Sequence, residues 1–131
     1  MMDLAILVIR LGLGIMFFAH GLQMAFGLFG GSGPEKFAEM LVGLEFRPAL
    51  FWSYLAAYTV LIGGLFLILG ISVRTTSIFL IIFMLVAAIK VHLSKGFFIT
   101  NGGFEYNFVV IFVLIGLLIC GAGKFSLFNK L

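Results

Sequence analysis

Long apolar runs separated by short polar segments dominate the sequence. The apolar runs cover four stretches, at about residues 4–28, 49–71, 76–93 and 104–121. Each stretch is close to the length of about 20 residues that an α-helix needs to cross the hydrocarbon core of a bilayer. The pattern therefore predicts an all-α integral membrane protein, a bundle of four transmembrane helices. The tight turn at residues 72–75 makes the second and third spans an antiparallel hairpin.

A glycine-rich segment ends the first span, and Pro34 then suits the first turn of a new helix. After it, apolar residues recur at i, i+3, i+4 and i+7, opposite three charged residues; the apolar positions are Phe37, Met40, Leu41 and Leu44. We interpret residues 34–44 as a short amphipathic helix that lies at the membrane surface. This helix is either a lid over the bundle or a passive connection between two spans.

One face of the first span combines small residues with a charge, which favours a place inside the bundle. That face consists of Arg10, Gly14, Phe17, Gly21 and Met24. Small residues let helices approach each other closely in lipid. His20 lies about 80° from Arg10 on the helical wheel, so we expect His20 within the inward stripe.

Arg10 interrupts the first apolar run with a positive charge. Its position fits a side chain that snorkels to the headgroups or caps a helix end. It also fits a charge anchor inside the bundle, with Asp3 or the backbone carbonyls near Ile71 as its partners. The sequence leaves both interpretations open.

The composition supports the membrane assignment, because 63% of the 131 residues are hydrophobic and 10% are charged. The mean hydropathy is +1.30. Soluble domains carry roughly 25% charged residues, so this chain cannot cover a surface that faces water. The net charge of +3 is small and scattered, which excludes nucleic-acid binding and indicates contact with anionic headgroups. We expect a single membrane domain over residues 1–131.

The sequence contains one cysteine, Cys120. An intramolecular disulfide and a Cys-x-x-Cys redox pair are therefore excluded, and any redox role needs a cofactor or a partner. Free cysteine usually behaves as a small buried hydrophobe, so we expect Cys120 to fill space in the core.

The N-terminal run lacks the features of a secretory signal peptide, since no basic segment precedes it and Arg10 interrupts it. Four spans place both termini on the same side of the membrane. Basic residues occur on both sides, so their distribution does not decide the orientation. We expect both termini in the cytoplasm and the protein in the plasma (inner) membrane of a prokaryote.

Short motifs follow one another along nearly the whole chain. In order they are Arg10, His20-Gly21, Gly63-Gly64, Gly70 followed by Arg74, His92 with Gly96-Phe97-Phe98, Gly102-Gly103 with Glu105-Tyr106, and Gly121-Ala122-Gly123-Lys124-Phe125-Ser126-Leu127. Together they resemble the DoxX family of small four-span membrane proteins. Members often carry a glutamate three residues before the double glycine, where this chain has Val60. Members also often carry an aspartate after the closing Ser-Leu pair, where this chain has Phe128.

The resemblance implies a likeness to the small subunit of a thiosulfate:quinone oxidoreductase and a link to redox and thiol homeostasis. It further implies contact with a quinone or with a redox or membrane protein partner. Whether this chain is itself catalytic stays open; if it is, the resemblance implies an oxidoreductase subunit. The small-residue faces also allow a homo-oligomer.

Polar side chains from three spans are expected at one membrane face, because successive spans alternate in direction. They are His20, Gln23, His92, Glu105, Tyr106 and Asn107. Ionisable groups at membrane depth are costly, so they tend to be paired and functional. Three interpretations stay open: side chains that hydrogen-bond to one another and fix helix ends, a site for the polar head of a ligand, or a metal site of two histidines and one carboxylate. No two of these side chains have a close ligand spacing, so we assign no metal.

Two functional hypotheses follow. In the first, the protein is a redox-associated membrane subunit that binds a quinone or lipid-like ligand, with its head group held by His20, His92 and Glu105. In the second, it is a non-enzymatic scaffold that binds other membrane proteins through its small-residue faces. For the first hypothesis we expect a carboxylate oxygen of Glu105 within hydrogen-bond reach of one of the two histidines, directly or through one water.

Overall fold

The computed structural model describes residues 1–126, and every regular element in this part of the chain is helical. The α-helices are α1 (Met2–Phe26), α2 (Gly33–Gly43), α3 (Ala49–Leu69), α4 (Val73–Ala87) and α5 (Glu105–Cys120). Short tight turns of helix cover Leu28–Gly30, Leu93–Lys95 and Ile99–Asn101, and a wider π-helical turn covers Ala88–His92. The predicted all-α fold class is confirmed for these residues.

Three helices are long and apolar enough to cross a membrane: α1, α3, and α4 together with its continuation to Lys95. These are the first three predicted spans. Helix α5 has 16 residues and is also apolar. It is about 24 Å long, somewhat shorter than the hydrocarbon core of about 30 Å.

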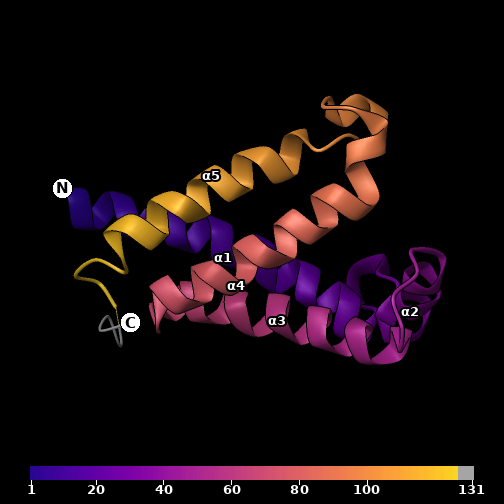
Figure 1. Ribbon diagram of the computed structural model, residues 1–131. Coiled ribbons are helices and arrows are strands. Elements are labelled where there is room, and N and C mark those ends of the chain that lie inside the picture. Colours follow the sequence, from indigo (N-terminus) through magenta and orange to yellow (C-terminus); the bar gives the residue numbers. More distant parts are fainter. Residues whose placement is uncertain (127–131) are drawn as a thin grey trace.

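The helices form two pairs that diverge from one end of the molecule. Helix α1 packs mainly against α3, and α4 packs mainly against α5. Figure 1 shows α4 leaving α3 at the turn after α3 and moving away from it along its length. The N-terminus and the end of α5 lie at the closed end of this arrangement, whereas α2 and the turns after α4 lie at the opposite end.

Glycine allows α1 and α3 to touch backbone to backbone. A Cβ atom on Gly14 would lie 2.8 Å from the carbonyl oxygen of Gly64. A Cβ atom on Gly64 would collide with the backbone nitrogen of Phe18, and one on Gly21 would collide with the backbone of Leu61. The small residues expected at a helix interface therefore set the closest contact in the bundle.

The core runs along the inner faces of α1, α3, α4 and α5. It consists of Ile6, Phe17, Val60, Leu67, Val73, Leu80, Met84, Val110, Leu114, Leu117 and Ala122. The predicted inward face of α1 is correct for Arg10, Gly14, Phe17 and Gly21, all of which are buried. Met24 is partly buried against the core, whereas His20, which was expected within the inward stripe, is exposed.

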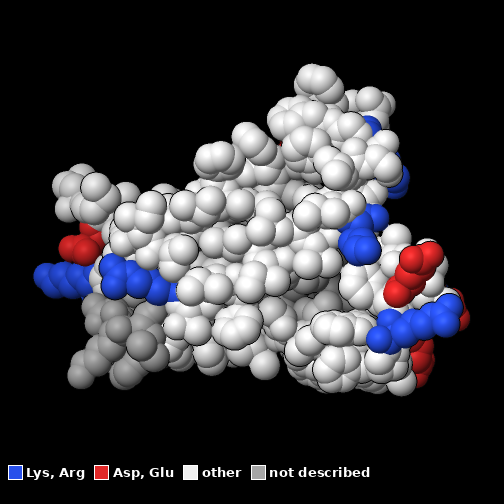
Figure 2. All heavy atoms as spheres, viewed as in Figure 1, with Lys and Arg blue, Asp and Glu red and all other residues white. Residues whose placement is uncertain are grey.

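Many large apolar side chains point outward, as a lipid environment requires. Figure 2 shows that the charged side chains gather at the two ends of the molecule, and that the face in view is uncharged between them. Charges avoid the hydrocarbon core because burying them there is costly. The chain is a multi-pass membrane protein.

Helix α2 forms within one residue of the predicted boundaries. Ala38 and Leu41 are buried, Phe37 is half-buried, and the charged residues Glu35 and Lys36 are exposed. The helix packs on α3 and α1. Its position at the membrane surface stays a prediction.

The contact between α1 and α3 leads to a test of the fold. Gly64→Ala places a methyl group against the backbone of α1, so we expect the free energy of unfolding to fall by roughly 1–3 kcal/mol or more. The matched control is Gly116→Ala on α5, because nothing lies within 4 Å of its Cβ position. That change should be neutral or stabilise by roughly 0.5–1 kcal/mol. Thermal unfolding in detergent measures both, and equal effects would contradict the close packing.

Candidate functional site

A small cavity lies inside the wide end of the bundle, with a volume of about 170 Å³. Its walls come from α1, α3, α4, the π-helical turn and α5; the lining residues are Phe17, His20, Met24, Val60, Phe83, Met84, Ala87, His92, Tyr106 and Asn107. We call it the polar cavity. It brings together four of the six predicted ligand-binding residues, from three different helical segments.

His92 reaches the polar cavity because the backbone changes after Ala87 from an α-helix to a π-helical turn. Such widened turns often occur at functional positions. The Nδ1 atom of His92 lies 2.7 Å from the carbonyl oxygen of Gly102. A carbonyl only accepts, so Nδ1 carries the proton, and Nε2 of the neutral ring is an acceptor.

Asn107 is the most deeply buried polar side chain of the polar cavity, with 2% of its surface exposed. Its amide nitrogen donates to the carbonyl oxygen of Met84 at 3.3 Å. Its Oδ1 atom is buried and has no hydrogen-bond partner among the described residues. Leaving a buried acceptor unpaired costs roughly 1–3 kcal/mol, so this oxygen is poised to accept a hydrogen bond.

Tyr106 and His20 form the remaining polar wall. The hydroxyl of Tyr106 donates to the sulfur of Met16 at 2.9 Å, and its ring centroid is 6.5 Å from that of His20. Tyr106 is half-buried, whereas His20 lies at the exposed edge of the polar cavity.

Gln23 and Glu105 do not line the polar cavity. The amide of Gln23 donates to the carbonyl oxygen of Phe29 at 3.3 Å. Glu105 accepts a hydrogen bond at 3.1 Å from the backbone N–H of Ile99. Neither histidine is a direct hydrogen-bond partner of Glu105 within residues 1–126, so that form of the expectation is wrong.

The loop before α5 explains this difference. Its backbone folds back on itself, since the N–H of Glu105 donates to the carbonyl oxygen of Phe97 at 2.7 Å. The carboxylate then lies at the start of the short helical turn Ile99–Asn101 and caps it. This hydrogen bond is local to the loop. The carboxylate of Glu105 therefore pairs with the backbone of Ile99 rather than with a histidine farther away.

The metal hypothesis finds no ligand set in the described part of the chain. No group of three or more histidine, cysteine, aspartate or glutamate side chains there is arranged to hold a metal ion. His92, Glu105 and Asn107 are instead hydrogen-bonded to backbone groups.

Arg10 occupies the opposite end of the bundle and is almost fully buried, with 1% of its surface exposed. Its Nε donates to the carbonyl oxygen of Leu67 at 2.9 Å and its Nη2 to that of Ile68 at 3.3 Å. Its Nη1 donates to the carbonyl oxygens of Ala122 and Phe125, at 2.7 and 2.6 Å. Arg10 thus caps the end of α3 and also binds the segment that follows α5.

The predicted partners of Arg10 were therefore right for the backbone carbonyls and wrong for Asp3. Asp3 instead accepts a hydrogen bond from the backbone N–H of Lys124 at 3.0 Å. Cys120 is exposed, so the expectation of a buried cysteine is wrong. The closing motif is described as far as Ser126, and Leu127 and Phe128 lie outside the described residues.

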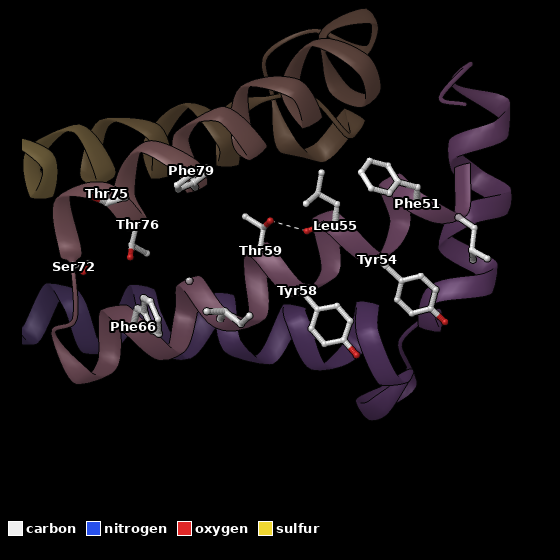
Figure 3. Close-up of a pocket in the computed structure, with 13 residues that line it drawn as sticks. Phe51, Tyr54, Leu55, Tyr58, Thr59, Phe66, Ser72, Thr75, Thr76 and Phe79 are labelled. Carbon is white, nitrogen blue, oxygen red and sulfur yellow. Dashed lines mark hydrogen bonds between the residues drawn. The ribbon is translucent and has the colours of Figure 1, made fainter. Parts of the chain in front are cut away.

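A larger groove runs along the outside of the bundle between α3 and α4, with a volume of about 820 Å³ (Figure 3). Phe66 and Phe79 are among its walls, together with the hydroxyl-bearing residues Thr59 and Thr76. The hydroxyl of Thr59 is already used, because it donates to the carbonyl oxygen of Leu55 at 2.6 Å. The groove is mostly apolar, whereas Asn107, which has an unpaired buried acceptor, lines the polar cavity, so we regard the polar cavity as the candidate site.

Sequence reasoning missed the apolar walls of the polar cavity and the groove. Phe17 lies on the predicted inward face of the first span, and Val60 could have been found because it lies three residues before the Gly63-Gly64 pair, on the same side of α3 as Gly63 and Gly64. The groove could not, because it depends on the angle at which α4 leaves α3.

The helices and the polar cavity define a multi-pass helical membrane protein with a small buried site near one end. The comparison with family models gives the family: a DoxX model matches residues 5–93, and the chain belongs to the DoxX family. The match extends from α1 through the π-helical turn after α4 and includes both histidines. No curated protein and no solved structure matches the chain.

The family assignment makes Val60 informative. The resemblance noted in the sequence implies that members often carry a glutamate at this position, and here it is a fully buried valine in the wall of the polar cavity. The departure from the family pattern therefore falls inside the candidate site and leaves that wall without a carboxylate.

The contacts of Arg10 predict a large effect on stability. Arg10→Met keeps a long apolar side chain but removes every donor, so we expect a loss of roughly 3 kcal/mol in the free energy of unfolding. Arg74→Met is the control, because Arg74 also donates to helix-end carbonyls, those of Leu118 and Ile119, but is exposed. Water replaces its hydrogen bonds, so the loss should be much smaller. Equal losses in a thermal melt would show that burial of Arg10 is not important.

Proposed function

We propose that this protein binds the polar head of a quinone or lipid-like ligand in the polar cavity and serves as a redox-associated component of the membrane. The observation that carries the proposal is the buried, unpaired Oδ1 atom of Asn107 in a cavity that two histidines also line. Ligand sites typically join an apolar pocket to a few polar anchors. The polar cavity has this composition.

The size of the polar cavity limits what enters it. Complete ligand sites usually measure about 300–1,000 Å³, whereas a cavity of about 150 Å³ is known to hold a benzene ring. At about 170 Å³, the polar cavity fits one six-membered ring. A ligand with a long tail would insert its ring here and leave the tail in the bilayer.

We further propose that α5 is the fourth transmembrane span and that α2 lies at the membrane surface. Helix α5 packs against α4 and returns to the end of the molecule where the N-terminus lies. Its outward side chains, including Phe108 and Phe112, are apolar and exposed. In this arrangement the polar cavity lies near one membrane face and Arg10 near the other.

The single cysteine limits the redox role, since Cys120 has no second cysteine in the chain with which to form a dithiol. The protein would therefore act with a partner or a cofactor that carries the electrons. This is consistent with a ligand-binding component rather than with an enzyme that works alone.

A scaffold function is the second candidate, and the groove between α3 and α4 favours it. The groove is long, mostly apolar and open to the side of the bundle (Figure 3). A helix of another membrane protein, or of a second copy, would find an apolar surface there. In this case the polar cavity would have a structural role only.

The topology can be tested by labelling single cysteines in a Cys120→Ser background. We expect cysteines at Ser32 and Asn101 to react from one side of the membrane and a cysteine at Lys124 from the other. Lys124 is exposed and follows α5. Labelling of Asn101 and Lys124 from the same side would exclude α5 as a span.

The ligand site can be tested with decylplastoquinone in its oxidised and reduced forms. At least one form should raise the melting temperature of the purified protein, because a ligand at 100 times its Kd stabilises by about 2.7 kcal/mol. Asn107→Leu should remove the effect, whereas Thr59→Val in the groove should keep it. Absence of stabilisation by both forms would reject the ligand site and leave the scaffold function.

A further inference from the structure

We propose that the polar cavity selects a hydrogen-bond donor: it binds a head group that presents a hydroxyl, such as a phenol or a hydroquinone, in preference to one that presents only carbonyl or ether oxygens. This inference rests on the proposed function, since it takes the polar cavity as a ligand site. It follows from the way in which the polar side chains of the cavity are already hydrogen-bonded.

The first acceptor is Asn107. Its amide nitrogen is the atom next to the carbonyl oxygen of Met84, because a carbonyl can only accept. This contact fixes the orientation of the side-chain amide. Oδ1 is then the atom without a partner among the described residues, and it can only accept.

The second acceptor is His92. Its Nδ1 donates to the carbonyl oxygen of Gly102 at 2.7 Å, which fixes the tautomer of the neutral ring. Nε2 therefore presents a lone pair, and no hydrogen bond to this atom occurs within the described residues. The partner of Nδ1 is a backbone group in the loop, so the tautomer is held by the fold rather than by a titratable neighbour.

The third acceptor is Tyr106. Its hydroxyl hydrogen is directed to the sulfur of Met16 at 2.9 Å, and a phenolic oxygen has a remaining lone pair. His20 is exposed and its tautomer is not fixed by a hydrogen bond in the described part of the chain. The remaining lining side chains are apolar. The lining side chains thus offer three acceptors, and their remaining donors, the second N–H of Asn107 and the ring N–H of His20, are not held by any hydrogen bond in the described part of the chain.

A hydroxyl and a carbonyl meet different partners in such a cavity. A hydroxyl donates to Asn107 or His92 and satisfies a buried acceptor. A carbonyl or an ether meets the lone pairs of His92 and Tyr106 with its own, can pair only with the second N–H of Asn107 or the N–H of His20, and leaves Oδ1 of Asn107 unpaired. Sites built to pair a ligand hydroxyl reject analogues that lack it strongly, by more than the roughly 10–200-fold that one methylene group provides. We expect at least about tenfold here, because the polar cavity is partly open.

The isomers p-cresol and anisole test this selection, since they have the same atoms but only p-cresol has a hydroxyl. Isothermal titration of the detergent-solubilised protein measures both, with empty micelles as the reference. We expect p-cresol to bind at least about tenfold more tightly than anisole. Cyclohexanol distinguishes a phenolic from an aliphatic hydroxyl. If cyclohexanol binds weakly, the polar cavity selects a phenolic ring. If it binds as tightly as p-cresol, the polar cavity also accepts the hydroxyl of an aliphatic alcohol, such as that of a lipid.

Two variants connect the selection to the proposed acceptors. Asn107→Leu has a similar volume and removes the unpaired acceptor, so it should fold and lose most of the preference for p-cresol. If it does not fold, Tyr106→Phe keeps the ring, removes one acceptor and should reduce the preference. Anisole binding as tightly as p-cresol to the wild-type protein would overturn donor selection and leave the ligand site intact. Binding of neither isomer and of neither decylplastoquinone form would overturn both proposals.

Discussion

The burial of one positive charge, that of Arg10, shapes this bundle more than any other polar contact. A buried guanidinium is tolerated when its N–H groups are paired, and here all its hydrogen bonds go to backbone carbonyls. Two of these carbonyls belong to α3, where they end a helix, and two belong to the segment after α5. The helix-end carbonyls carry partial negative charge, so they suit a cation without a carboxylate. One side chain of α1 thereby holds both helix pairs together at a single end.

The contact between Arg10 and the end of α3 requires a glycine at position 70. Gly70 ends α3 in a left-handed conformation, with φ of 76°. A Cβ atom at this position would lie 2.8 Å from Nη2 of Arg10 and 2.7 Å from Cβ of Ser126. The carbonyls of α3 can approach the guanidinium only because this space is empty. Among residues 1–126, no buried charge bridges the helix pairs at the opposite end, where they separate and the polar cavity lies between them.

The sequence predicted those parts of the structure that depend on periodicity and on alternation of direction. The apolar runs predicted the ends of α1, α3 and α5 to within two residues, whereas α4 begins three residues earlier than predicted and changes at Ala88 to the π-helical turn. The alternation of spans placed His20, His92 and Asn107 around one cavity. Cys120 was misplaced although its position was calculable: it lies about 60° or more from the buried positions of α5 on a helical wheel. That error came from a general preference of cysteine and not from the pattern of the helix.

Contacts that involve irregular backbone could not be predicted from the sequence. Glu105 binds Ile99, and His92 binds Gly102, because the loop between α4 and α5 folds on itself. The apolar pattern carries no information about such a loop, since its glycines permit many conformations. The polar cavity could thus be located from the sequence, whereas the direction of its hydrogen bonds could not.

Val60 then decides the electrostatic character of the polar cavity. A glutamate at this position would lie in a wall shared with His92 and Asn107, and when ionised it would attract a cation or a proton. With valine, the wall is apolar and the polar groups that remain are neutral acceptors as long as the histidines are neutral. Neutral acceptors in an apolar cavity bind a neutral donor most favourably. The free-energy cost of burying a charged ligand there exceeds the stabilisation from its hydrogen bonds. An apolar side chain at position 60 is therefore consistent with the proposed preference for a neutral hydroxyl-bearing ligand over an ion.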